Sequence, residues 1–259
     1  MENGEFEMVS TSKLKFIKSL GVQKFRKIHQ QFVVEGPKMM DELFTSKYVL
    51  AEIFATPSWI RENQKRASEW QQIITEVSER ELSRLSGLKT ANKVLATVKI
   101  PDRKISEKDF NKLLLVLDGI SDPGNLGTII RTADWFGIQN LLCSADCVEL
   151  YNPKAVQASM GSLFRVKVFY NDLEQIITKF GKNIPVIGTT LDGENIFNMQ
   201  LPDQAMIIIG SESHGIRGTN QKLLTQRIMI PAIGPDVESL NAAVATGIVC
   251  SEFMRNSLK

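Results

Sequence analysis

The sequence contains few of the residues that disulfide-bonded and metal-binding proteins need. Its three cysteines, Cys143, Cys147 and Cys250, form neither an even set nor a CxxC pair, so we expect no disulfides. The only two histidines are His29 and His214, and we therefore expect no structural zinc and no other metal site. These absences argue against a disulfide scaffold or a zinc-binding module.

Long hydrophobic runs are also missing. No apolar stretch approaches the ~18 residues that a membrane-spanning helix requires. The N-terminal sequence MENGEFEMVS is acidic and lacks the basic-then-apolar order of a secretory signal. We therefore predict a cytoplasmic protein.

Common nucleotide-binding and hydrolase motifs are absent as well. The sequence has no GxGxxG motif after its first long strand and no GxxxxGK[ST] motif, which argues against a dinucleotide or nucleoside triphosphate site. It has no GxSxG motif, and His214 has no obvious serine or cysteine nucleophile to activate. Hydrolase chemistry therefore has little support.

The residues that are present indicate a globular protein with an uneven charge distribution. Of the 259 residues, 43% are apolar, and the formal net charge is only +2. Between residues 9 and 34, however, there is no acidic residue, and the basic residues are Lys13, Lys15, Lys18, Lys24, Arg26 and Lys27. This cluster is equally consistent with a nucleic-acid footprint and with a solvated helix face.

Alternating strand-like and helical patterns predict an α/β protein with two domains. Residues 1–100 contain the short strand-like runs QFVVEG, YVLAEIFAT, QIITEV and VLATVKI, and residues 101–111, PDRKISEKDFN, have the composition of a linker. Residues 112–259 contain the runs LLLVLD, NLLCS, FRVKVFY, IPVIGTTL, AMIIIG and RIMIPA, which predict a mostly parallel sheet. The segment SLNAAVATGIVCSEFMR predicts a final helix capped by Ser239 or Asn241.

Three glycine-containing loops follow strands of the second domain. Their sequences are DPGNLG, GSESHGIRG and IGPDVESLN. Glycine allows the backbone to approach a ligand closely, and ligands of open α/β sheets bind beyond the carboxyl ends of the strands. Each loop alone is most simply an ordinary turn between a strand and a helix, but the three together favour a single pocket.

The segments NLGTIIRTADWFGI, IIIGSESHGI and IPAIGPDVESLNAAVA, in this order, resemble the three motifs of the SpoU (TrmH-like) RNA 2′-O-methyltransferases of the SPOUT superfamily. The segments STSKLKFIKSL and FVVEGPKMMDEL resemble the L30e/L7Ae-like substrate-binding domain that often precedes that catalytic domain. The resemblance implies a parallel-sheet methyltransferase domain tied in a trefoil knot, homodimers and the cofactor S-adenosylmethionine. It places the cofactor at Thr189, Gly210, Ile230 and Leu240.

The resemblance also implies a set of catalytic residues, namely Asn125, Arg131, Glu212, Ser239 and Asn241. An arginine with a pKa above ~12 is a poor base, so we favour for Arg131 a clamp on the target phosphate. Glu212 would fix either Arg131 or a loop amide. For Asn125, Ser239 and Asn241, helix capping is the alternative interpretation.

We therefore predict a 2′-O-methyltransferase that acts on structured RNA, with ribosomal RNA as the first choice of substrate and tRNA as the second. A non-catalytic RNA-binding protein on the same scaffold is one alternative. A methyltransferase of small molecules is another, which the lysine-rich segment makes less attractive.

Overall fold

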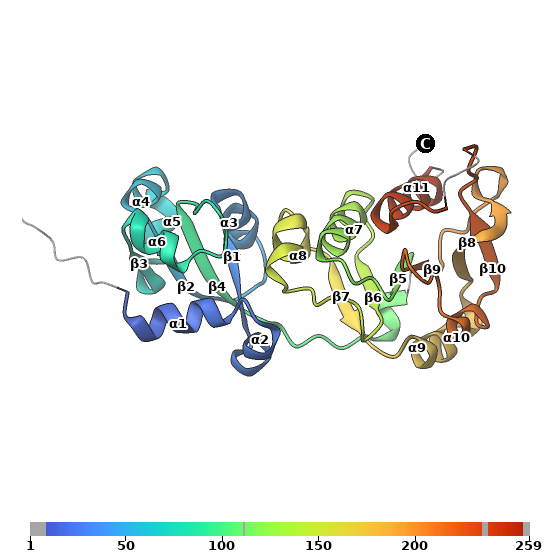
Figure 1. Cartoon of the computed structure of the whole chain (residues 1–259), viewed down its shortest axis with the longest axis horizontal. Coiled ribbons are helices and arrows are strands. Elements are labelled where there is room, and N and C mark those ends of the chain that lie inside the picture. Colours follow the sequence, from blue (N-terminus) through green and yellow to red (C-terminus); the bar gives the residue numbers. More distant parts are fainter. Residues whose placement is uncertain (1–8, 111, 235–237, 256–259) are drawn as a thin grey trace, which may run out of the picture. The chain divides into compact units, whose positions relative to one another are not determined.

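The computed structural model describes residues 9–110, 112–234 and 238–255, and its chain divides into two compact units (Figure 1). Unit 1 takes the chain up to Asp102 together with Tyr151–Phe164, and unit 2 takes Arg103–Leu150 and the chain from Arg165 onward. Among the described residues, none of the helices has the length and apolar character that crossing a bilayer requires.

Unit 1 is built on a four-stranded sheet of order β1-β4-β2-β3. Its strands are β1 (Gln31–Glu35), β2 (Leu50–Ala55), β3 (Ile74–Glu76) and β4 (Val94–Lys99). Strand β4 runs antiparallel to β1 and β2, and β3 runs parallel to β2. All four lie within the strand-like runs of the sequence. Burial alternates along β1, so that one of its faces lies in the core.

Helices surround this sheet and supply the rest of its core. They are α1 (Thr11–Ser19), α2 (Gln23–His29), α3 (Pro37–Phe44), α4 (Pro57–Glu62), α5 (Gln64–Glu69), α6 (Glu79–Leu85) and α8 (Pro153–Ala158). Ile17 of α1 and Leu82 of α6 pack with Phe54 of β2 and Leu95 of β4. The side chain of Ser78 begins α6 by a reciprocal capping box with Glu81.

The segment Tyr151–Phe164 reaches unit 1 from the middle of the chain. The ring of Tyr151 packs on Phe32 with a centroid distance of 4.4 Å, and Tyr48 meets Phe164 edge to face at 5.2 Å. The hydroxyl of Tyr48 donates to the carbonyl of Leu163 at 3.2 Å. Apolar contacts between aromatic rings therefore join residues more than a hundred positions apart in the sequence.

Unit 2 is built on a six-stranded parallel sheet of order β10-β8-β9-β5-β6-β7. Its strands are β5 (Leu114–Asp118), β6 (Asn140–Cys143), β7 (Lys167–Tyr170), β8 (Val186–Asn195), β9 (Met206–Gly210) and β10 (Gln226–Met229). Every residue of β5 is buried, as expected for a strand covered on both faces. The predicted parallel α/β sheet is confirmed, whereas the trefoil knot stays a prediction.

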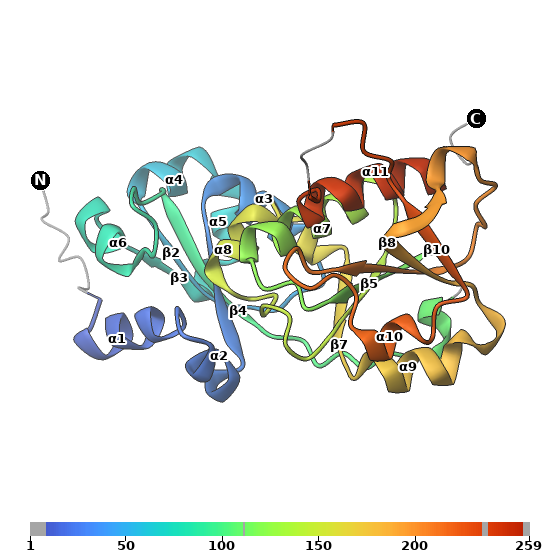
Figure 2. The same ribbon diagram turned by 45° about the vertical axis from the view of Figure 1, so that its right-hand side comes forward.

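The helices of unit 2 are α7 (Pro123–Trp135), α9 (Leu173–Phe180), α10 (Gly218–Gln221) and α11 (Ala242–Met254). Helices α7 and α11 pack side by side (Figure 2). The short 3-10 helix Glu107–Phe110 falls within the predicted linker, yet Phe110 is buried in the core of unit 2 and stacks on Phe180 at 4.3 Å. Asn111, the last residue of that predicted linker, lies outside the described residues.

The strand order determines where loops converge. Strands β8, β9 and β5 are neighbours and parallel, so the segments that follow them begin at the same edge of the sheet. In open α/β sheets this edge carries the ligand site. The loop after β9 and the loop that leads into α7 therefore begin close together, although they are far apart in the sequence.

Candidate functional site

A cavity of about 790 Å³ lies in unit 2, within the size range of small-molecule sites. It is lined by the middle of β8, the loop after β9, the loop after β10 and the first turn of α11. Two of the three glycine-containing loops thus contribute to one pocket, whereas the sequence predicted that all three would. The described lining residues do not include the first loop, DPGNLG.

The four residues predicted to hold a cofactor all line this cavity, namely Thr189, Gly210, Ile230 and Leu240. The loop after Gly210 turns back on itself through paired backbone hydrogen bonds between Ser211 and Gly215. A β-carbon at position 210 would overlap the backbone of Gly215 and Ile216, so only glycine fits there.

The chemistry of the cavity wall suits a ligand with an apolar body and a positive charge. Its apolar part includes Ile209, Ile230, Leu240 and further aliphatic side chains. Its charged part, among the described lining residues, consists of the carboxylates of Asp192, Glu212 and Glu238 and one guanidinium, that of Arg227. Arg227 is itself paired with Asp192 at 2.8 Å. The remaining charge on the wall is therefore negative.

Three of the predicted catalytic residues are in direct contact at the edge of this cavity. Asn125 Nδ2 donates to Glu212 Oε1, and Asn241 Nδ2 donates to Asn125 Oδ1 at 2.9 Å. The backbone amide of Ala242 also donates to Glu212 Oε1, at 3.3 Å. Each of the three side chains comes from a different motif loop. The carboxylate of Glu212 therefore ties the start of α7 to the start of α11.

Helix capping accounts for only one of these residues. Asp122 caps α7 by accepting from the backbone amide of Asn125 at 2.8 Å, which leaves the Asn125 side chain to contact Glu212. Asn241 does cap α11, because its Oδ1 accepts from Ala243 N at 2.9 Å, while its Nδ2 donates to Asn125 Oδ1. Of the two caps considered for this helix, Asn241 is thus the right one, and Ser239 lines the cavity instead.

Arg131 lies apart from this cluster. It is exposed on α7, and no residue in the described part of the chain forms a hydrogen bond or ion pair with it. Of the two partners considered for Glu212, Arg131 is not in contact with it. In place of a loop amide, Glu212 accepts from the side-chain amide of Asn125 and from the first backbone amide of α11, that of Ala242. The guanidinium of Arg131 is therefore directed at solvent.

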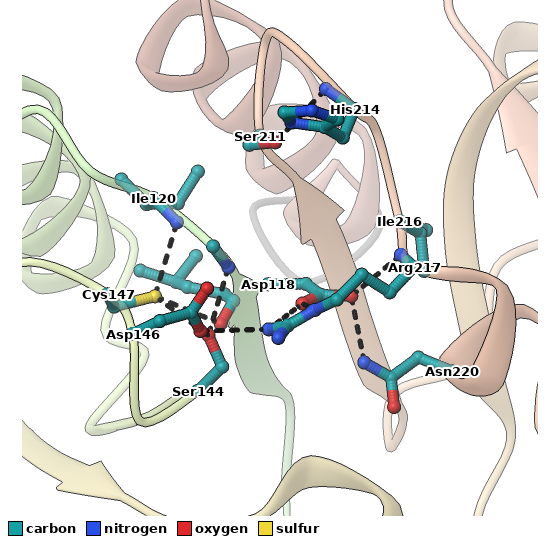
Figure 3. A network of polar contacts seen from close by, with 12 residues as sticks. Asp118, Ile120, Ser144, Asp146, Cys147, Ser211, His214, Ile216, Arg217 and Asn220 are labelled. Carbon is teal, nitrogen blue, oxygen red and sulfur yellow. Dashed lines mark hydrogen bonds and ion pairs between the residues drawn. The ribbon is translucent and has the colours of Figure 1, made fainter.

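A second polar network, which the sequence analysis did not single out, lies behind the loop after β9 (Figure 3). Asp118, at the carboxyl end of β5, has a fully buried side chain and accepts from the backbone amide and Nε of Arg217. It also accepts from Asn220 Nδ2 at 2.8 Å. Asp118 raises the pKa of Arg217 through this hydrogen bond and its charge. The loop is therefore fixed to the end of β5.

The network continues to the loop after β6. Arg217 Nη2 donates to Asp146 at 3.0 Å, and Ser144 Oγ donates to the same carboxylate at 2.7 Å. The Ser144 hydroxyl lowers the pKa of Asp146. The nearby Cys147 has its pKa lowered to about 7, chiefly by a hydrogen bond from Cys143, with Ser144 and the amide of Ile120 adding to it. All three cysteines of the chain are free and buried.

Two regions of the chain match known protein families. Residues 112–251 match the SpoU rRNA Methylase family, and residues 11–96 match the MRM3-like substrate binding domain. The 23S rRNA (guanosine(2553)-2′-O)-methyltransferase RlmP of Bacillus subtilis is 26% identical over 249 residues, which cover 95% of this chain and 97% of that protein. RlmB of Pasteurella multocida, a 23S rRNA (guanosine-2′-O-)-methyltransferase, is 33% identical over 172 residues, 61% of this chain and 69% of that one.

Solved structures share the fold of the whole chain. A putative RNA methyltransferase of the TrmH family from Porphyromonas gingivalis superposes with a TM-score of 0.84 at 35% identity, covering 96% of this chain and 99% of that one. The SpoU methyltransferase AviRb from Streptomyces viridochromogenes, solved with the cofactor AdoMet, shares the fold with a TM-score of 0.83 at 23% identity, covering 96% and 99%. The chain belongs to the SpoU rRNA methylase family.

Proposed function

We propose that this chain methylates ribose 2′-hydroxyls of ribosomal RNA at the cluster of Asn125, Glu212 and Asn241. As a member of the SpoU family, the chain is an S-adenosylmethionine-dependent RNA 2′-O-methyltransferase. The choice of ribosomal RNA over tRNA is supported by relatives that are named as 23S rRNA methyltransferases. The observation that carries the proposed site is the contact of three motif loops beside one cavity.

The residues of the cavity fit S-adenosylmethionine. Its adenosine and carbon chain suit the apolar wall, and the excess of carboxylates suits its positive charge. We assign the cofactor to Thr189, Gly210, Ile230 and Leu240. When bound there, the cofactor supplies an activated methyl group whose sulfonium leaves as a neutral thioether, so the site needs no acid to protonate a leaving group.

The cluster would then act by positioning the acceptor hydroxyl. Glu212 fixes the amide of Asn125 from one side and Asn241 fixes it from the other, so this amide is held in one orientation. We assign to Asn125 the orientation of the ribose and to Ser239 a further hydrogen bond. The exposed guanidinium of Arg131 holds the target phosphate and stabilises the developing alkoxide.

The remaining parts of the proposal concern the domains and the assembly. We assign residues 1–100 to RNA binding, 101–111 to the connection and 112–259 to methyl transfer, all in the cytoplasm. Within these ranges, Phe110 packs in unit 2 and Tyr151–Phe164 pack in unit 1. We also propose a homodimer with an isologous interface. It is supported by the exposed apolar side chains of Trp135 on α7 and Val244 on α11, two helices that pack together.

Methyl transfer from labelled S-adenosylmethionine tests the proposal. Purified ribosomal RNA and tRNA, both from a strain that lacks the gene, serve as acceptors. We expect label in ribosomal RNA, loss of at least about 100-fold in Asn125→Ala, and normal transfer in Asn171→Ala. Asn171 is a suitable control because it lies in unit 2 and its side chain contacts no described residue by a hydrogen bond. Label in tRNA alone would contradict the substrate assignment, and full activity of Asn125→Ala would contradict the site.

A further inference from the structure

We propose that helix α2 of unit 1 carries a binding site for unpaired nucleobases of RNA, with Phe25 and His29 as the stacking surface. This inference rests on the proposed function, because it takes RNA as the substrate. It goes further by naming the surface that reads the RNA and by specifying single-stranded rather than duplex structure.

Helix α2 and Val22, the residue before it, present apolar side chains to solvent. Val22, Phe25 and Ile28 recur every three residues and are 54%, 37% and 60% exposed. His29 lies one turn beyond Phe25, and the two rings are nearly parallel, with a centroid distance of 6.4 Å and an angle of 14°. Phe16 of α1 meets His29 edge to face at 5.0 Å. Apolar and aromatic side chains grouped on one exposed face indicate a contact surface.

This surface is preformed. Arg26 of α2 is buried, and its Nη1 donates to the carbonyl of Leu20 at 2.7 Å. That bond ties α2 to the end of α1, and the helix is followed directly by β1 (Figure 1). Gln30 ends the helix in the left-handed conformation. Binding of RNA would therefore cost little conformational entropy in α2, which raises the affinity.

The positive charge of α1 and α2 favours RNA as the partner. Lys15, Lys18, Lys24 and Lys27 are exposed, and no acidic residue occurs between residues 9 and 34. Lys13 is not counted, because it pairs with Glu52 at 2.7 Å. Aromatic rings bordered by cations are the pattern by which proteins bind single strands, since bases stack on the rings and lysines contact the phosphates. A duplex keeps its bases stacked inside, so the faces of the bases are not available to these rings.

Fluorescence anisotropy of the full chain tests the site with two probes, a short oligouridylate and an RNA duplex of similar length. We expect Phe25→Ala to weaken binding of the oligouridylate by about tenfold and to leave duplex binding and the salt dependence unchanged. Phe25→Trp should restore oligouridylate binding, since it keeps a stacking ring. Phe197→Ala, which removes an aromatic ring of unit 2 that is 42% exposed, should bind both probes as the original chain does.

The double variant Lys24→Gln, Lys27→Gln separates this inference from the proposed function. It should weaken binding of both probes and reduce the slope of log affinity against log salt by about 0.7 for each lysine on the single strand. Loss in this variant with no loss in Phe25→Ala would overturn the stacking site and leave RNA binding by unit 1 intact. No loss of RNA affinity in either variant would overturn both the stacking site and RNA binding by unit 1.

Two further outcomes also decide against the site. Equal loss of both probes in Phe25→Ala would show a contact that does not depend on unpaired bases. A change in sedimentation of Phe25→Ala with unchanged RNA affinity would show that a second copy of the chain covers α2. Circular dichroism confirms that each variant is folded, and Phe25→Leu provides a variant that keeps the apolar contact but lacks the ring.

Discussion

Arg217→Met and Asp118→Asn remove opposite partners of the same ion pair, and we expect them to have unequal costs. The side chain of Asp118 is fully buried, whereas that of Arg217 is 46% exposed. Removal of Arg217 leaves a carboxylate that cannot reach water. Removal of the Asp118 charge leaves a guanidinium that remains partly hydrated and still contacts Asp146 at 3.0 Å. The first change should therefore destabilise unit 2 more than the second.

The expected losses in the free energy of unfolding depend on the hydrogen bonds that each variant keeps. Breaking a buried pair from one side costs about 3–5 kcal/mol, and Asp118 would keep the hydrogen bonds from Asn220 and from the backbone amide at position 217. We therefore expect Arg217→Met to lower the free energy of unfolding by about 3 kcal/mol. For Asp118→Asn we expect about 1–2 kcal/mol, the value of charge-assisted hydrogen bonds that are partly replaced by water.

Urea unfolding followed by circular dichroism measures the total effect, and hydrogen exchange in β5 and β9 assigns it to unit 2. The double variant should cost less than the sum of the single ones, because the two residues share one interaction. The affinity for S-adenosylmethionine should fall with Arg217→Met, since the loop that this residue fixes lines the cavity. A larger cost for Asp118→Asn, or costs below about 0.5 kcal/mol for both, would refute the reasoning.

Three further predictions concern single substitutions. Arg131→Lys should lower kcat by about 100-fold with unchanged affinity for S-adenosylmethionine, and normal turnover would disprove the phosphate clamp. Gly210→Ala should lower the free energy of unfolding by about 1–3 kcal/mol, because the added methyl group meets the backbone of Gly215 and Ile216. It should also weaken cofactor binding, measured by calorimetry. Unchanged stability and unchanged binding would argue against the close approach of residues 210 and 215. Ser144→Ala should raise the lowered pKa of Asp146. The stability that Asp146 contributes is present above its unfolded pKa of about 3.9 and is lost as the pH falls through its folded pKa. The variant should therefore have a lower free energy of unfolding at pH ~7, and this free energy should fall less on acidification than that of the original chain. If the two proteins lose the same stability on acidification, the prediction is wrong.

Local patterns in the sequence were sufficient for the strands and the loops, whereas the family resemblance supplied the residues of the cavity. The run LLLVLD forms β5 because continuous apolar residues suit a strand that is covered on both faces. Gly210, Ile230 and Leu240 line one cavity because they lie at the end of β9, directly after β10 and just before α11. The family resemblance, rather than the spacing, supplied the identity of the cofactor.

Long-range contacts account for what the sequence could not reveal. Asp118 and Arg217 are separated by 99 positions, and the only local signal was a single acidic residue at the end of an apolar strand. Asn125 and Asn241 are separated by 116, and either residue alone was as consistent with capping as with a site. Phe110 stands in a polar stretch, so its burial in the core of unit 2 depends on Phe180, which lies far along the chain. Arg26 was part of the basic cluster, yet it is buried and serves the turn between α1 and α2.

A crystal structure of this chain with S-adenosylmethionine would show where the cofactor binds. We expect the cofactor in the cavity of about 790 Å³, in contact with Gly210, Ile230 and Leu240. Its methyl group should face the cluster of Asn125 and Glu212. A cofactor bound elsewhere, or one whose methyl group points away from this cluster, would contradict the account.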